Sequence, residues 1–110
     1  MPVAVTVEAP GMSREAYVAL HHETAPKITD GGGYGLLFHS AGIVDGVLVA
    51  MDVWESREDF ERFEREILRP SIQAAEGSGP PPSVQIVELF NLWAPGADRL
   101  GQLGADPSPN

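Results

Sequence analysis

The sequence predicts an α+β fold in which four antiparallel strands and two helices follow one another in the order βαββαβ. Three observations predict it: an Asp-Gly turn between two apolar segments, two serine-capped amphipathic segments, and apolar residues that alternate near both ends of residues 1–94. We expect one domain over residues 1–94, because 110 residues build a single modest core. Residues 95–110 are rich in Pro, Gly, Asp and Ser and are predicted to form a flexible C-terminal tail.

The first strand and helix occupy the N-terminal third of the chain. Val3, Val5 and Val7 alternate with Ala, Thr and Glu, which is the two-residue period of a strand. Ser13 can cap a helix whose apolar positions recur at three- and four-residue spacing. We expect this helix to end near Pro26, before a glycine-rich connection.

A hairpin follows at residues 35–54, with Asp45-Gly46 as its turn. A two-residue type I′ turn needs positive φ at both central positions, and this dipeptide tolerates that. If Val44 faces Val47, the register pairs the following residues across the hairpin: Ala41 with Ala50, His39 with Asp52, and Leu37 with Trp54. These pairs are predicted to share one face of the sheet.

The second helix and the last strand complete the order. Ser56 with Asp59 resembles a capping box and starts a helix with an apolar stripe that includes Phe60 and Phe63. Pro70 predicts a kink or a restart in that helix. Residues 78–82 read as a linker and residues 84–93 as the last strand.

This element order is the split βαβ, or ferredoxin-like, arrangement, in which both helices cover one face of a four-stranded antiparallel sheet. The other face stays bare, yet the hairpin and the last strand are apolar on both faces. A bare apolar sheet face of this size indicates association. We therefore expect a homodimer that joins the two sheets in an α+β barrel.

The composition excludes several classes of partner and site. The chain has 7 basic and 16 acidic residues and a net charge of −9, which disfavours nucleic acid and anionic membranes as partners. It contains no cysteine, so disulfides, thiolate nucleophiles and cysteine-ligated metals are excluded. No leader or membrane-spanning segment is evident, which predicts a cytoplasmic protein with no membrane partner.

The residues around the hairpin also resemble a known family, the small antibiotic-biosynthesis-monooxygenase-like proteins of the dimeric α+β barrel superfamily. The resemblance covers about residues 1–94 and includes His39, the Asp45-Gly46 turn and residues 52–56 leading to Phe60, Phe63 and Pro70. It implies a fold but no single reaction, because the superfamily includes cofactor-free monooxygenases, haem-degrading enzymes, isomerases and dechlorinating enzymes. Haem-degrading relatives carry Trp and His at the positions of Phe63 and Gln73, and this departure argues against haem degradation.

His39 opposite Asp52 is the sharpest candidate catalytic pair. A carboxylate beside an imidazole sets its tautomer and favours the imidazolium, as a general base requires. The alternative interpretation is a cross-strand polar pair that only stabilises the sheet. The sequence does not decide whether the pair faces the helices or a dimer partner.

Further residues are candidates for binding a substrate: Tyr17, His21, Trp54, Phe63 and Trp93. The aromatic members, with Phe60, either line a pocket between helices and sheet or form the core of a small domain. A metal site is not expected, because His21 and His22 have no suitably spaced carboxylate except Glu23. No cofactor is expected.

Two functions follow as hypotheses, and a vestigial structural dimer that binds nothing is a third possibility. The first is a cofactor-independent, monooxygenase-like enzyme that acts on a small aromatic or hydrophobic metabolite, with His39 as base and Asp52 as the group that orients it. The second is a non-catalytic homodimer that binds a small ligand.

Overall fold

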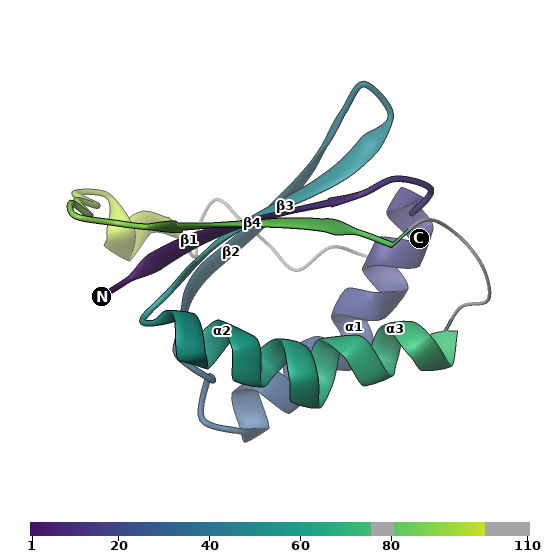
Figure 1. Cartoon of the computed structure of the whole chain (residues 1–110), viewed down its shortest axis with the longest axis horizontal. Helices are drawn as coiled ribbons and strands as arrows, with labels where there is room; N and C mark the ends of the chain where they lie inside the picture. The colour runs from purple at the N-terminus through teal and green to yellow at the C-terminus, as the bar shows by residue number, and fades with distance from the viewer. Residues whose placement is uncertain (76–80, 101–110) are drawn as a thin grey trace.

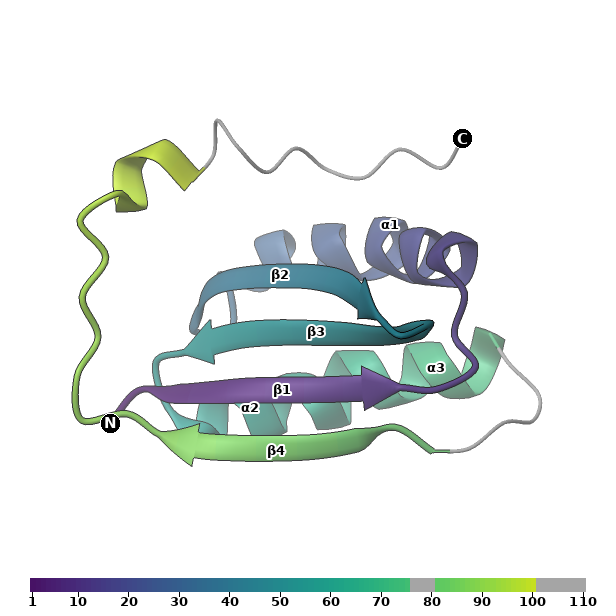
Figure 2. The same ribbon diagram turned by 90° about the horizontal axis from the view of Figure 1, so that it is seen from above.

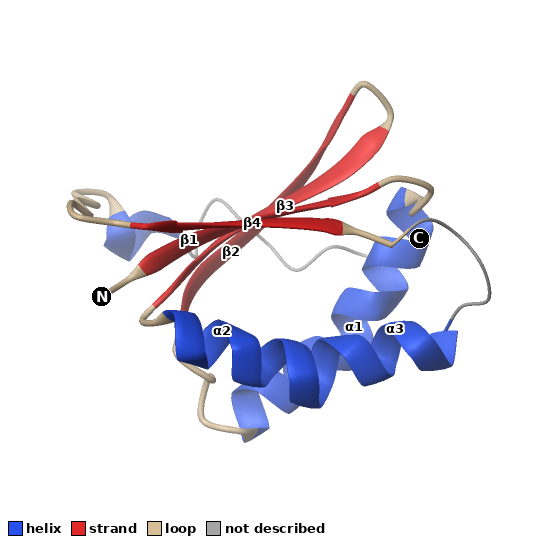
Figure 3. Ribbon diagram, in the orientation of Figure 1, coloured by secondary structure: helices blue, strands red, loops and turns tan. Residues whose placement is uncertain are grey.

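The computed structural model describes residues 1–75 and 81–100. Four strands form one antiparallel sheet in the order β2-β3-β1-β4, and the helices cover one of its faces (Figures 1 and 3). The strands are β1 (Val3–Ala9), β2 (Leu36–Val44), β3 (Val47–Trp54) and β4 (Ser83–Glu88). The predicted ferredoxin-like α+β fold is confirmed.

The first helix, α1 (Arg14–Asp30), begins as predicted, with the Ala16 N–H donating to Ser13 Oγ at 3.0 Å. The expectation that it ends near Pro26 is wrong, because the helix continues for four more residues. Proline removes one donor from the interior of a helix. Pro26 is exposed, and the helix continues through it to Asp30.

The second helical segment is α2 (Arg57–Phe63), the π-helical turn η1 (Glu64–Leu68) and α3 (Arg69–Ala75) in immediate succession. Its start is as predicted, since the Asp59 N–H donates to Ser56 Oγ at 3.1 Å. The predicted irregularity at Pro70 is present as a change of helix type, because the π-helical turn ends at Leu68 and α3 begins at Arg69, without a break between them. The wide turn just before it, in which the Arg69 N–H donates to the Glu64 carbonyl, accommodates the proline.

The hairpin turn is confirmed, with φ of 51° at Asp45 and 80° at Gly46. The register is confirmed at Val44 with Val47 and at His39 with Asp52, but the predicted pairing of Leu37 with Trp54 is wrong. A bulge between Leu36 and Phe38 makes Leu36 the partner of Trp54. A bulge inserts one unpaired residue into a strand, and the hydrophobic pattern of the sequence does not indicate its position.

The last strand is shorter than predicted and ends at Glu88. Its partner β1 begins at Val3, and the last contact between them is the Leu89 N–H donating to the Pro2 carbonyl at 2.9 Å. Within the described part of the chain, residues 90–93 therefore have no strand paired with them. The chain beyond includes a short 3₁₀ turn, η2 (Ala97–Arg99), while residues 78–80 of the predicted linker and 101–110 of the predicted tail lie outside the described residues.

The core lies between the sheet and the second helical segment. It consists of two β1 valines and a cluster from β3 and that segment: Val3, Val5, Trp54, Phe60, Phe63 and Ile67. Trp54 is fully buried, and its ring centroid lies 5.6 Å from that of Phe60 and 5.0 Å from that of Phe63. This packing holds α1, α2 and α3 on one face of the sheet, and none of these three helices lies on the other face (Figure 1).

Candidate functional site

His39 and Asp52 lie on the face of the sheet that the helices cover. They are opposite each other in β2 and β3, as the predicted register requires. His39 Nδ1 lies 2.6 Å from Asp52 Oδ1, and the Asp52 side chain is buried while that of His39 is partly exposed. Because a carboxylate accepts, Nδ1 carries the hydrogen and the Nε2 lone pair faces the other way.

Tyr17 of α1 completes a hydrogen-bonded chain. Its Oη lies 2.5 Å from His39 Nε2, so the phenol donates to the imidazole nitrogen that Asp52 leaves basic. Burial, and then the negative charge of Asp52, raise the pKa of Tyr17 to about 12. The proton therefore stays on Tyr17 at neutral pH, and the chain runs from phenol to imidazole to carboxylate.

His21 stands one helical turn after Tyr17 and packs on both other rings. Its ring centroid lies 5.9 Å from that of Tyr17 and 5.9 Å from that of His39, and its plane is tilted by 19° from that of His39. Residues four apart share one face of a helix, which is why α1 presents both side chains to β2. Three rings from two elements thus form one stacked group.

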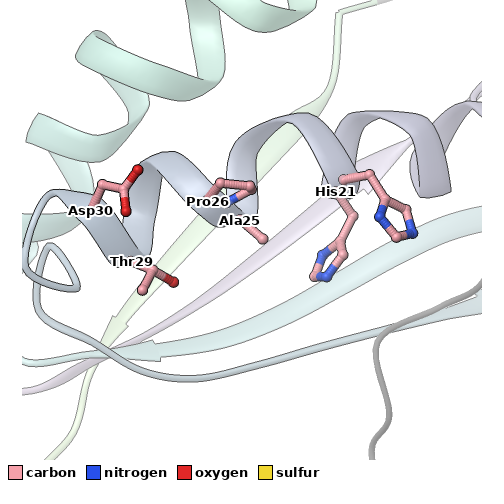
Figure 4. A pocket seen from close by; sticks show the side chains of 6 residues that line it. His21, Ala25, Pro26, Thr29 and Asp30 are labelled. Atoms are coloured by element: carbon pink, nitrogen blue, oxygen red, sulfur yellow. The ribbon is translucent and has the colours of Figure 1, made fainter.

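An open hollow of about 370 Å³ adjoins this group along α1 (Figure 4). Its lining runs from His21 to the last residue of the helix: His21, His22, Ala25, Pro26, Thr29 and Asp30. His21 is thus shared by the hollow and the stacked rings. A small ligand in the hollow would lie against His21, whereas Tyr17, His39 and Asp52 are not among the residues that line the hollow.

The structure separates the other predicted binding residues from this site. Trp54 and Phe63 are buried in the core against each other, and Trp54 Nε1 has no hydrogen-bond partner in the described part of the chain. Trp93 is 80% exposed beyond the end of β4. Tyr17 and His21 are the two that the fold brings to His39.

Sequence reasoning paired His39 with Asp52 through the turn, but it did not pair Tyr17 with His39. Those two residues are 22 positions apart, on a helix and a strand whose docking no local spacing specifies. The hollow residues from His22 to Asp30 also carried no signal except their helical spacing. Among the described residues, no group of three His, Asp or Glu side chains is placed to hold a metal ion.

The two positions compared with haem-degrading relatives, Phe63 and Gln73, lie in the second helical segment. Phe63 is buried in the core, and the side chain of Gln73 lies outside the described residues.

No helix in the described segments is long and apolar enough to cross a membrane.

Comparison with known proteins finds relatives only among solved structures, since no protein-family model and no curated protein matches. Rv0793 from Mycobacterium tuberculosis superposes with a TM-score of 0.59 at 20% sequence identity, over 86% of this chain and 100% of Rv0793. This chain has the fold of Rv0793. The predicted ferredoxin-like α+β fold is therefore also the fold of a solved protein.

Two other solved structures are similar at lower TM-scores. One is the haem degrader MhuD (Rv3592) from Mycobacterium tuberculosis with two haems in its active site, at a TM-score of 0.49 and 18% identity over 83% of this chain and 99% of MhuD. The other is the monooxygenase from the gene ActVA-Orf6 of Streptomyces coelicolor in complex with nanaomycin D, at a TM-score of 0.47 and 19% identity over 86% of this chain and 91% of the other.

Proposed function

We propose that this chain is an enzyme that oxygenates a small, electron-rich aromatic substrate without a cofactor, at the site formed by Tyr17, His39 and Asp52. One observation carries the proposal: an imidazole is held between a buried carboxylate and a phenol, beside an open hollow. A buried polar pair that only stabilised the sheet would need neither the phenol nor the hollow.

The chain of hydrogen bonds supplies a route for one proton. A substrate hydroxyl that donates to Tyr17 Oη can pass its proton to that oxygen while the Tyr17 proton moves to His39 Nε2. The imidazolium that forms is stabilised by Asp52, which is already hydrogen-bonded to Nδ1. Because its pKa is about 12, Tyr17 transfers a proton in concert instead of resting as a phenolate.

Removal of that proton makes the substrate a much better electron donor to O₂. For a hydroxylated anthrone, the overall reaction converts the ring CH₂ and O₂ into a carbonyl and one water molecule. Two C–H bonds and the O–O bond break, one oxygen atom enters the product, and the other leaves as water. The returning proton on His39 is available to protonate the oxygen that leaves.

The hollow favours a flat substrate of modest size. His21 gives it an aromatic wall, Ala25 and Pro26 add apolar surface, and Thr29 and Asp30 offer hydrogen-bonding groups at its far end. Polar groups at the two ends of an apolar wall suit a ring system with hydroxyl groups on its rim.

We further propose that the working form is a homodimer, as the sequence predicts. The face of the sheet opposite the helices carries a set of exposed apolar side chains, which are Phe38, Val44, Met51 and Val87. Apolar surface of this extent is typical of an association site. The homodimer and the cytoplasmic location stay predictions.

The experiment uses 1,8-dihydroxyanthrone as the probe. Purified chain is mixed with the probe under ¹⁸O₂, and we expect faster formation of the quinone than in buffer, with one labelled atom retained in the product. His39→Gln keeps a polar side chain but removes the base, so we expect a loss of about 10²- to 10⁴-fold in rate.

Tyr34→Phe is the matched control for Tyr17→Phe, because the chain has two tyrosines and Tyr34 hydrogen-bonds Glu66 away from the site. We expect Tyr17→Phe to slow turnover and Tyr34→Phe to leave it unchanged. If the probe binds but neither wild type nor variants accelerate its oxidation, the catalytic proposal is wrong and the ligand-binding hypothesis takes its place.

A further inference from the structure

The proposed reaction removes two protons from the substrate, and they leave from two different atoms. The first leaves a substrate hydroxyl, enters the hydrogen-bonded chain at Tyr17 and makes His39 an imidazolium beside Asp52. The second leaves the ring carbon that becomes the carbonyl, after O₂ has added to that carbon. Because Tyr17 meets the hydroxyl, the chain serves the first proton. A base at another position is needed for the second.

His21 lies where such a base is needed, because it belongs both to the stacked rings and to the lining of the hollow. A ligand that lies against His21 has Tyr17 within reach, since the two ring centroids are 5.9 Å apart. Figure 2 shows α1, which carries both residues, along the β2 edge of the sheet, and His21 is partly exposed there. A substrate can therefore approach His21 from solvent.

The hollow has two further side chains that can accept a proton, His22 and Asp30, and both are placed less well. His22 is exposed, and its ring stands at 89° to that of His21, so it does not continue the stack. Asp30 is also exposed and lies nine residues beyond His21, about 13.5 Å along the helix axis. Neither is held beside the Tyr17 hydroxyl as His21 is.

We propose that His21 is a second catalytic base, which removes the C–H proton of a substrate hydroperoxide and so releases water and the quinone. This role rests on the proposed function, because it completes the same reaction at the same site. It adds a chemical task to a residue that otherwise supplies an aromatic wall.

The atoms and electrons balance over two steps. O₂ takes two electrons from the substrate anion as it bonds to the ring carbon, and the outer oxygen of the peroxide receives the proton of His39. His21 then takes the proton from the same carbon, the C–H electron pair becomes the second C–O bond of the carbonyl, and the O–O bond breaks. The departing hydroxide takes the proton from His21 and leaves as water. One CH₂ group and one O₂ molecule thus give one carbonyl and one water molecule.

The closeness of the two imidazoles sets the order of these transfers. The ring centroids of His21 and His39 lie 5.9 Å apart, and two positively charged rings at that separation repel each other. His39 therefore delivers its proton to the peroxide before His21 accepts one. The two histidines act in sequence, and the site carries one imidazolium at a time.

Single-turnover oxidation of 1,8-dihydroxyanthrone under ¹⁸O₂ tests this role. His21→Phe keeps an aromatic ring in the stack and removes the base. We expect this variant to consume O₂ at about the wild-type rate but to form the quinone about 10²-fold more slowly. A hydroperoxide with two labelled oxygen atoms should accumulate, as detected by mass spectrometry after rapid quenching. His39→Gln should instead slow the uptake of O₂ and accumulate no hydroperoxide.

His22→Phe is the matched control, because it makes the same change at the neighbouring position of the hollow. We expect no accumulation of hydroperoxide in this variant. Equal accumulation in His21→Phe and His22→Phe would show that the shape of the hollow, and not a base at position 21, controls the second step, and would overturn the proposal.

His21→Ala gives a second test by chemical rescue, because it opens space beside a hollow that solvent already reaches. Added imidazole should restore formation of the quinone in His21→Ala but not in His39→Gln, whose position does not line the hollow. Absence of rescue in His21→Ala would contradict the role of His21.

The two proposals fail in different ways. If the wild type consumes no O₂ with the probe, the proposed function and the role of His21 fail together. If the wild type forms the quinone and His21→Phe forms it equally fast, only the role of His21 fails.

Discussion

The side of the sheet that faces the helices has two regions that differ in chemistry. Under α2 and η1, apolar side chains from three elements exclude solvent around Trp54. Under α1, the same side of the sheet carries Tyr17, His39 and Asp52, which contact one another through hydrogen bonds. One helical layer therefore covers a closed core at one side and a partly open polar site at the other.

The difference shows why two aromatic residues that look alike in the sequence have different roles. Trp54 and Tyr17 are both aromatic residues on elements that form the interior. Trp54 lies in β3, with Val3 of β1 and Leu36 of β2 beside it, so its side chain is shielded from solvent. Tyr17 lies over the edge strand β2 and is partly exposed to solvent. Position relative to the sheet edge, and not residue type, separates core from site.

The largest expected effect is on the closed region. Trp54→Ala should lower the free energy of unfolding by about 3–5 kcal/mol, because it leaves a cavity among Phe60, Phe63 and Val3. The measurement is urea denaturation at a dilution at which the wild type is monomeric. Trp93→Ala is the matched control, since the chain has two tryptophans and this one is 80% exposed. Similar losses in the two variants would contradict the assignment of Trp54 to the core and of Trp93 to the surface.

A smaller effect is expected in the polar region. Asp52→Asn keeps the shape but removes the charge that His39 Nδ1 contacts, and we expect a loss of about 1.5–3 kcal/mol in the free energy of unfolding. It should also slow oxidation of the anthrone probe, because the tautomer of His39 is no longer set.

Glu64→Gln is the control for Asp52→Asn. It removes the charge of Glu64 from the Arg69–Glu64 pair, whose side chains are 56% and 31% exposed, and should cost about 0–1 kcal/mol. A cost as large as that of Asp52→Asn would show that burial of the His39–Asp52 pair contributes nothing.

The smallest effect is spectroscopic. Tyr17 has a pKa of about 12 in the folded chain and an ordinary value of about 10 when unfolded. As pH rises from 10 to 12 the unfolded chain loses this proton first, so the contribution of Tyr17 to stability is complete below pH 10 and is lost by pH 12. Absorbance at 295 nm after a rapid pH jump should show this late transition in wild type and Tyr34→Phe but not in Tyr17→Phe. A wild-type Tyr17 transition near pH 10 would mean that the phenol is not buried beside Asp52.

Much of the fold and half of the site follow from local sequence signals. Local signals fixed three features of the fold, because each depends on residues only a few positions away. Two serines, Ser13 and Ser56, cap the first turns of the helices and predict where they start. The Asp45-Gly46 turn sets the hairpin register and so predicts the pairing of His39 with Asp52. The end of a strand depends instead on its neighbour, which is why the extent of β4 could not be predicted from its own residues.

The sequence by itself determined the element order, the hairpin register around His39 and the strong acidic charge. The element order and the register depend on residues that are near neighbours in the chain, and the net charge is a sum over all charged residues. Only the tertiary structure decided that His39 and Asp52 face the helices, that Tyr17 and His21 pack on them, and that Trp54 is core while Trp93 is exposed. The position of the site depends on how α1 docks on the sheet, and the exposure of Trp93 depends on where β4 ends. Helix docking and strand length are both set by packing between residues that are far apart in the sequence, which local spacing does not encode.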